Sequence, residues 1–339
     1  MAAGAAGELE RTAVGMSMAR LEIVPFSDEH LEDAGRLLAA RHARQREAEP
    51  LLAERFAQPA EAREEVAAAW REESASGAAA FRDGRPVGYL IAAPRDVEVW
   101  GENIWIEAAG HAVEEAENIR DLYAVAAAAW VAEGRRRHYA LVPATDVELV
   151  NAWFRLGFGQ QQAHGIREIP KRVDVRLPDG FEIREPREED IEALLAVDIA
   201  LPAHQRSSPV FSTRSLPTED EIRREWRSTL AGDEEKVLIG CLEGRPVACW
   251  SVCAAELSSH FRGLMRPERA GYLAFASTVP EIRGSGIGVA LTDASLAAAA
   301  EDGYAAMVTD WRVTNLLASR FWPKRGFRTC FLRLYRSIP

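Results

Sequence analysis

The chain has 339 residues and a formal net charge of −11 at pH 7, with 47% hydrophobic and 27% charged residues. This length predicts about two domains, each with a substantial core. The acidic balance argues against a general nucleic-acid or anionic-membrane partner, and it mildly favours a cationic substrate such as an amine. No apolar run approaches the roughly 20 residues that span a membrane, so we expect a cytoplasmic protein. The sequence leaves its oligomeric state open.

The N-terminal segment and the cysteines also fit a cytoplasmic protein. Residues 1–16 contain acidic and basic residues and no apolar core, so we expect a flexible tail and not a signal peptide. The cysteines have no Cys-x-x-Cys spacing and no clustered histidines, which predicts reduced thiols and no metal site. They are Cys241, Cys249, Cys253 and Cys330.

Beyond the tail, the chain repeats itself. Gly84-Arg85-Pro86-Val87 recurs 160 residues later as Gly244-Arg245-Pro246-Val247, and each copy lies between apolar runs, which predicts two β-hairpins. Trp153-x-x-x-Gly157-Phe158 recurs 169 residues later as Trp322-x-x-x-Gly326-Phe327. The pattern is interrupted near residues 170–180. We therefore expect a tail and two similar domains, at residues 1–16, 17–172 and 173–339.

The first half lacks an obvious ligand-binding loop. Its predicted strand at 104–109 leads into a segment that contains Glu114, Glu115 and Glu117 and no glycine. Such a segment cannot bring its N–H groups close to an anion, and its carboxylates repel one. We therefore expect a non-catalytic first domain, which is either a scaffold or a wall of the second domain's substrate cleft. We interpret His164 as a structural histidine.

The second half places a glycine-rich turn between a strand at 272–278 and a helix that begins near Gly288. Gly284, Gly286 and Gly288 let the backbone approach a bound anion, and the N-terminal end of the helix favours negative charge. Arg283 adds a cation, so the pattern predicts a phosphate cradle. A dinucleotide fingerprint is excluded, because Val289 stands where the third glycine of Gly-x-Gly-x-x-Gly belongs.

Two motifs in this half carry a family resemblance. Arg283-x-x-Gly286-x-Gly288 resembles the acyl-CoA pyrophosphate motif of the GNAT superfamily of N-acetyltransferases. Asn315-x-x-Ala318-x-x-x-Trp322-x-x-x-Gly326-Phe327 resembles the family's next motif, in the right order and at the right distance. The chain is similar in layout to tandem-domain members of the actinobacterial type, such as mycothiol synthase. The resemblance implies an α/β (α+β mixed sheet) fold with two tandem domains, each a mostly antiparallel mixed sheet flanked by helices.

The resemblance also implies a cosubstrate and a reaction. The cosubstrate is acetyl-CoA, and the acceptor is a small-molecule amine that attacks the thioester directly. CoA is expected to contact the cradle and the end of the preceding strand, whose backbone holds the pantetheine arm. Asn315 is expected either to contact CoA or to cap the last long helix. The implied cofactor-binding residues are Ala276, Ser277, Thr278, Arg283, Gly284, Ser285, Gly286, Ile287, Gly288 and Asn315.

The proton-transfer groups depart from the family pattern. The family's usual donor to the departing thiolate is a tyrosine seven residues after the motif asparagine, and this chain has Trp322 there. An indole has no proton acidic enough to give. Tyr335 and Ser319 are the nearby alternatives. Asp310, at the carboxyl end of a predicted strand at 305–309, is the candidate base, and a turn or helix-cap residue is its other interpretation.

The acceptor side is the least predictable part. Residues 201–216 are rich in proline and are expected to form an acceptor-side lid. Glu256 and His260 lie on a loop that borders the expected cleft, and solvated loop residues are the alternative interpretation of both. Two other functions therefore stay open: a protein acetyltransferase acting on a lysine or an N-terminal amine, and a non-catalytic acyl-CoA-binding protein, which Trp322 favours.

Overall fold

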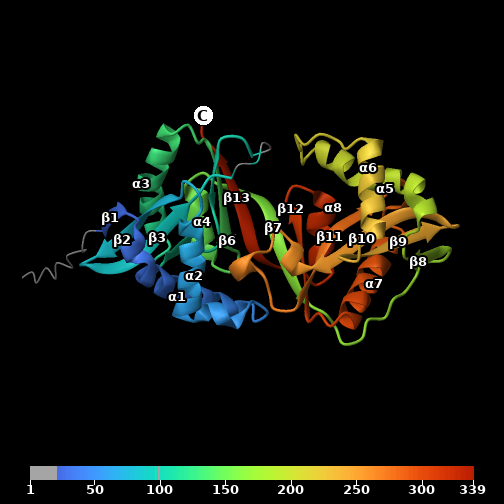
Figure 1. Ribbon diagram of the computed structural model, residues 1–339, viewed down its shortest axis with the longest axis horizontal. Helices are drawn as coiled ribbons and strands as arrows, with labels where there is room; N and C mark the ends of the chain where they lie inside the picture. The colour runs from blue at the N-terminus through green and yellow to red at the C-terminus, as the bar shows by residue number, and fades with distance from the viewer. Residues whose placement is uncertain (1–20, 96, 98–99) are drawn as a thin grey trace, which may run out of the picture.

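The computed structural model describes residues 21–339 apart from residues 96, 98 and 99. The tail predicted at 1–16 lies outside the described residues. Helices flank the sheets in each half of the chain, as the sequence predicts (Figure 1). No helix in the described part has both the length and the apolar character needed to cross a membrane.

The two halves have similar element orders. The first half contains β1 (Leu21–Pro25), α1 (Leu31–Ala48), α2 (Pro59–Trp70), β2 (Ser76–Arg82), β3 (Arg85–Ala92), β4 (Asn103–Ile106), β5 (His111–Val113), α3 (Asn118–Ala132), β6 (Arg137–Pro143), α4 (Val147–Arg155) and β7 (Gly159–Glu168). The second contains β8 (Phe181–Arg184), α5 (Ile191–Arg206), α6 (Glu219–Ala231), β9 (Glu235–Leu242), β10 (Arg245–Ala254), β11 (Ala270–Thr278), α7 (Ile287–Glu301), β12 (Ala306–Arg312), α8 (Leu316–Lys324) and β13 (Arg328–Ser337).

The strands of the described residues form two sheets. Four strands pair in the order β1-β2-β3-β5, and nine pair in the order β4-β6-β13-β7-β12-β11-β10-β9-β8. Two pairs in the larger sheet are parallel, β4 with β6 and β11 with β12, and the other pairs are antiparallel. The predicted class, a mostly antiparallel mixed sheet flanked by helices, is confirmed.

The final strands of the two halves are exchanged. β13, from the second half, lies between β6 and β7 of the first half, and β7 lies between β13 and β12. Figure 1 shows these strands side by side at the centre of the molecule. One apolar core accordingly includes both Trp153 and Trp250. The domain boundary between residues 172 and 173 stays a prediction. In space, the last strand of each half, β7 or β13, lies between two strands of the other half.

The repeated Gly-Arg-Pro segments form the predicted hairpin turns. Asp83 and Gly84 join β2 to β3, and Glu243 and Gly244 join β9 to β10. All four residues have a positive φ, between 51° and 79°. This is the geometry of the two-residue turn that matches the twist of antiparallel strands, and glycine adopts it without strain.

The repeated Trp-Gly-Phe motif ends a helix in each half. Its glycine has a φ of 82° in both copies, and the N–H of the following phenylalanine bonds to the carbonyl of the tryptophan at 3.3 Å (Phe158 to Trp153) and 3.2 Å (Phe327 to Trp322). The two aromatic rings meet edge to face, with centroids 4.9 Å and 5.4 Å apart. The motif is therefore a helix C-terminal cap with its own apolar contact.

Two elements extend further than the sequence predicts. α5 continues through Pro202 to Arg206, although proline disfavours a helix interior, so residues 201–206 are helical and not part of a lid. β12 continues to Arg312 because β7 pairs with its whole length. Asp310 is therefore inside a strand and is neither at its carboxyl end nor a helix cap.

The exchanged strands predict fragment complementation. If the chain is cut in the exposed connector between residues 172 and 173, each fragment lacks the strand that covers an edge of its sheet. We expect either fragment alone to aggregate, because unpaired edges recruit other chains, and the two fragments expressed together to co-purify one to one. Pull-down and thermal unfolding monitored by circular dichroism measure this. A lone fragment that unfolds cooperatively as a monomer contradicts it.

Candidate active site

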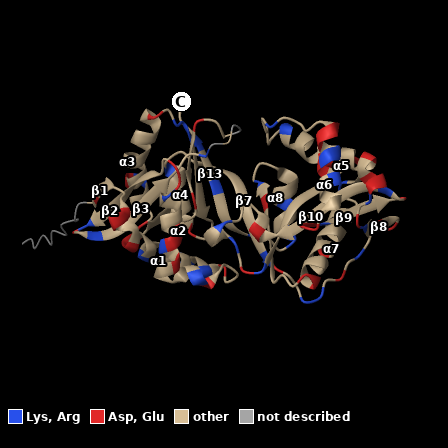
Figure 2. Cartoon of the chain, viewed as in Figure 1, with Lys and Arg blue, Asp and Glu red and all other residues tan. Residues whose placement is uncertain are grey.

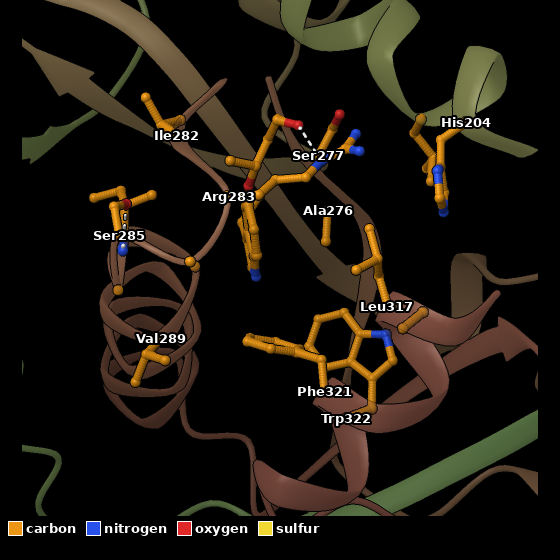
Figure 3. A pocket seen from close by; sticks show the side chains of 18 of the residues that line it. His204, Ala276, Ser277, Ile282, Arg283, Ser285, Val289, Leu317, Phe321 and Trp322 are labelled. Carbon is orange, nitrogen blue, oxygen red and sulfur yellow. Dashed lines mark hydrogen bonds between the residues drawn. The ribbon is translucent and has the colours of Figure 1, made fainter. Parts of the chain in front are cut away.

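A cavity of about 370 Å³ lies between β11, the turn before α7, and α8 (Figure 3). All ten residues that the sequence assigns to cofactor binding line it. They are Ala276, Ser277, Thr278, Arg283, Gly284, Ser285, Gly286, Ile287, Gly288 and Asn315. Their roles stay a prediction, and their common location means that one ligand in this cavity is able to touch all of them.

The glycine-rich turn leaves backbone donors free at the start of α7. Gly284 and Gly286 have φ values of 88° and 96°, which side chains disfavour. Gly286 is the N-cap, and its carbonyl accepts the N–H groups of Val289 and Ala290. The N–H groups of Gly284, Gly286 and Gly288 have no acceptor among the described residues. Free donors at a helix N-terminus form an anion-binding site.

The opposite wall of the cavity is aromatic. Trp250 comes from β10, whereas Phe321 and Trp322 come from α8. Trp322 is 6% exposed, and Figure 3 shows it beside Phe321, with Leu317 above them. The indole contributes apolar surface here, and the same residue ends α8 through its contact with Phe327.

His204 is a cavity residue that the sequence analysis missed. It lies in the last turn of α5 and lines the cavity on the side opposite Ser285 and Val289 (Figure 3). Its Nε2 donates to Oδ1 of Asn315 at 3.2 Å. The same Oδ1 accepts the N–H groups of Leu317 and Ala318 at 3.2 Å each, so Asn315 caps α8. The continuation of a helix past Pro202 is the signal that would have found His204.

The sheet opens beside this cavity. β11 and β12 pair only as far as Tyr272 and Val308, and beyond them the Thr309 hydroxyl donates to the carbonyl of Leu273 at 2.9 Å. Ala274 is skipped in the pairing with β10, so a β-bulge lies at the same point. Ala274 is exposed although its strand is central in the sheet. The strand that carries this opening also lines the cavity, through Ala276, Ser277 and Thr278.

Asp310 lies at this opening within a polar cluster. Its Oδ1 accepts hydrogen bonds from Nδ1 of His260 at 2.9 Å and from the Tyr272 hydroxyl at 2.8 Å, and Gln162 donates to its other oxygen. Burial alone would raise the pKa of Asp310, but the hydrogen bond and charge of His260, together with the hydrogen bond from Tyr272, outweigh it and hold the pKa at about 2. Asp310 is thus an ionised acceptor and a weak base.

The other predicted proton-transfer residues lie apart from the cavity. Tyr335 is on β13, where its ring packs against Tyr139 with centroids 5.0 Å apart. Neither Tyr335 nor Ser319 is among the residues that line the cavity. Glu256 is exposed and lies 3.8 Å from Arg266. A catalytic role for Tyr335 stays a prediction that its position does not favour.

The segment before α3 is the first-half counterpart of the cradle. Glu114 pairs with Arg85, and Glu115 pairs with Arg82. Glu117 is the N-cap of α3 and makes no side-chain cap. These exposed ion pairs place carboxylates at the start of α3, in contrast to the glycines and the arginine that precede α7. That the first half is non-catalytic stays a prediction.

Comparison with known proteins finds a family match within the second half. Residues 200–327 match the acetyltransferase (GNAT) family. Among solved structures, a GCN5-related N-acetyltransferase from Sphaerobacter thermophilus matches with a TM-score of 0.57 and 13% identity, covering 94% of this chain and 95% of that chain. No curated protein matches the sequence.

A second solved structure is a glucosamine N-acetyltransferase region of a fungal multi-domain GH3 β-N-acetylglucosaminidase. It matches with a TM-score of 0.53 and 15% identity, covering 94% of this chain and 38% of that longer chain. At these identities the likeness shows the fold, and it extends over both halves of the chain.

The low pKa of Asp310 predicts how stability depends on pH. Its folded value of about 2 lies below the ordinary value of 3.8, so the ionised carboxylate stabilises the fold above pH 4, by about 2 kcal/mol. This stabilisation is lost as the pH falls from about 4 towards 2. Asp310→Asn should therefore lower the free energy of unfolding at pH 7 by about 2 kcal/mol. In urea denaturation, the difference in free energy of unfolding between the parent and this variant should become smaller below pH 4.

A second aspartate provides the control. Burial raises the pKa of Asp198, so its ionised form destabilises the fold, and the pH dependence of Asp198→Asn should run in the opposite direction. If the free energies of unfolding of the parent and Asp310→Asn differ by the same amount from pH 7 to pH 3, the low pKa of Asp310 is contradicted.

Proposed function

Because residues 200–327 form a GNAT-family domain in a chain that has the GCN5-related acetyltransferase fold, we propose that this protein transfers the acetyl group of acetyl-CoA to a small-molecule amine. One observation carries the proposal: free N–H groups of a left-handed glycine turn lie at a helix N-terminus, in the wall of a cavity that also follows the end of β11. The four cysteines are free and buried, which supports a reducing, cytoplasmic location.

The cradle and cavity suit the two ends of a CoA thioester. The pyrophosphate would accept the N–H groups of Gly284, Gly286 and Gly288, with Arg283 adding a positive charge. The pantetheine arm would follow β11 between the aromatic wall and the backbone of residues 276–278. The thioester would then lie near the opening at Ala274, where β12 no longer occupies the edge of β11.

The reaction needs three proton transfers. The ammonium must lose one proton before the amine attacks the thioester carbonyl carbon. As the C–N bond forms, the attacking nitrogen loses a second proton, and as the C–S bond breaks, the departing thiolate takes one. Among the residues that line the cavity, His204 and Arg283 alone have ionisable side chains, and arginine does not give up its proton. We therefore assign the protonation of the thiolate to His204. Its Nε2 donates to Asn315, so Nδ1 is the atom that would take the second proton from the nitrogen and pass it to the thiolate.

Substitution at His204 tests this assignment. His204→Gln keeps a donor to Asn315 but has no proton to exchange, so kcat should fall about 100-fold while the dissociation constant of CoA stays within threefold. Thiol release from acetyl-CoA measures the first quantity, and calorimetry measures the second. Trp322→Tyr in the His204→Gln background should restore part of the activity, because a phenol would then line the same cavity.

Two outcomes would contradict the role of His204. One is full activity of His204→Gln. The other is an equal loss from Trp322→Phe in the parent chain, since that change alters only packing and should preserve most of the turnover.

The cradle has its own test. Gly288 has ordinary backbone geometry, and a Cβ there would meet Trp250 at 3.5 Å, an ordinary contact. Gly288→Glu should therefore leave the thermal stability nearly unchanged but weaken CoA binding at least about 100-fold, because a carboxylate would face the pyrophosphate in a partly buried site. Gly286→Glu is a poorer probe, since its φ of 96° strains any side chain.

A matched charge change serves as the control for the cradle. Gly232→Glu adds the same charge after α6, at a residue that does not line the cavity, and it should not affect CoA binding. Retained binding in Gly288→Glu would falsify the cradle assignment.

A non-catalytic acyl-CoA-binding protein is the second candidate, and Trp322 is the observation that favours it. The indole occupies the position from which the family's tyrosine acts, and it supplies no proton. An acetyl-CoA thiol-release assay across an amine panel, run beside a CoA titration, separates the two. Binding without turnover of any amine supports the second candidate.

A further inference from the structure

A row of polar side chains crosses the exchanged strands on one face of the central sheet. In register, Arg312 of β12 lies opposite Gln162 of β7, and Gln162 lies opposite Arg333 of β13. Side chains directly opposite each other share a face, and the contacts agree with this. Arg333 donates to Gln162, and Gln162 donates to Asp310. Two strands that the sequence assigns to different halves therefore bring two arginines together.

These two arginines have no carboxylate partner. Arg333 is 5% exposed, and its guanidinium donates to the neutral amides of Gln161 and Gln162. Neither Arg333 nor Arg312 forms an ion pair within the described part of the chain. Burial, and after it the charge of Arg312, lower the pKa of Arg333 to about 10, although the charge of Asp310 acts in the opposite direction. Two largely buried cations that share one nearby carboxylate are incompletely neutralised, and an anion that binds here would reduce that cost.

The local charge balance is positive, in contrast to the chain's net charge of −11. Arg95 is neutralised by Glu107, and Asp310 offsets one of the two remaining arginines. The charge of Arg214 also acts on Arg312 and lowers its pKa, after burial as the larger cause. Figure 2 shows basic residues along β13, between the two halves. An anion is therefore attracted to this part of a protein that otherwise repels it.

A small cavity at the same place contains an unsatisfied histidine. The cavity of about 20 Å³ is lined by His164, His260 and Arg333, with Arg95 and Trp105 of the first half as its other wall. His164 is 2% exposed, and neither of its ring nitrogens has a hydrogen-bond partner among the described residues. Burial lowers its pKa to about 3, so it is neutral, with one donor and one acceptor. A cavity of this size holds one small polar group.

The same cavity contains a histidine that is held in a fixed orientation. His260 is 43% exposed at its side chain, and its Nδ1 donates to Asp310, which leaves Nε2 free to take a proton. Tyr272 holds Asp310 from β11, two residues before the exposed Ala274 at the opening of the sheet. Through Asp310, His260 is therefore linked to the strand that carries the opening at Ala274, near which the proposed function puts the thioester.

We propose that this junction, defined by Arg312, Arg333, His164 and His260, binds the acceptor, and that the acceptor is a compact amine with a carboxylate or other anionic group close to its nitrogen. Arg312 and Arg333 bind the anionic group. His260 takes one proton from the ammonium, and the amine then attacks the thioester. Asp310 is a positioning residue that orients His260, and not the base. The inference rests on the proposed function, and it makes the first half a wall of the acceptor site.

Pairs of amines that differ by one carboxylate test the proposal in the full chain. Glycine and methylamine are one such pair, and β-alanine and ethylamine are another. We expect the carboxylate-bearing member of each pair to have the higher kcat/KM in the thiol-release assay, by at least tenfold. Calorimetry of the same amines with the CoA-loaded protein gives a readout without turnover, and there the carboxylate-bearing member should bind more tightly.

Three variants separate the roles of the residues. Arg312→Gln should raise the KM of the carboxylate-bearing amine about 10- to 100-fold. It should change the KM of the amine without a carboxylate by less than threefold. His260→Gln should lower kcat and leave KM and CoA affinity within threefold of the parent. Arg227→Gln removes an exposed arginine on α6 and should change none of these quantities.

Failure of this proposal differs from failure of the proposed function. If CoA binds but no carboxylate-bearing amine binds or reacts better than its partner, the anionic acceptor is wrong and the acetyltransferase proposal stands. An equal effect of Arg312→Gln on both members of a pair leads to the same conclusion. If CoA itself does not bind to the parent chain, the proposed function fails. Weaker CoA binding in Arg312→Gln would assign the arginines to the cofactor and overturn the proposal.

Discussion

The pairing of β13 with β6 and β7 is the constraint on which the rest of the molecule depends. It makes one continuous sheet out of two sequence repeats, and it places β7 against the whole length of β12. Without β7, β12 would end in a free edge, and Asp310 would lack its contact with Gln162. The second half therefore contains the proposed cofactor cavity, and the proposed acceptor face includes a strand of the first half.

This arrangement explains how a half without a cradle stays useful. The carboxylates before α3 are paired with arginines at the surface, and their charges oppose the binding of an anion there. What the first half contributes is geometry: β7, the strand β6 that holds β13, and the side chains of Arg95 and Trp105 beside the small cavity. We therefore expect the first half to act as a scaffold whose strands the second half requires.

The sequence predicts the parts of the site that depend on neighbouring residues. The cradle is readable because its arginine and glycines are adjacent in the chain, and hairpin turns are readable for the same reason. His164 was interpreted as an ordinary structural histidine, yet both of its ring nitrogens lack partners. The environment of Asp310 was unreadable, because it is built by residues from three separate strands and one loop. His204 was missed because proline usually ends a helix, whereas α5 continues past Pro202.

The strand exchange also has a consequence for synthesis on the ribosome. β13 is translated after β12 and α8, and β7 precedes its partner β12 by well over a hundred residues. At cellular translation rates of about 5–20 residues per second, the edges of β6 and β7 wait for about 10 s or longer. Unpaired edges are aggregation sites during that time. The nascent first half is therefore expected to need chaperone protection until β13 has been made, although its own residues were made long before.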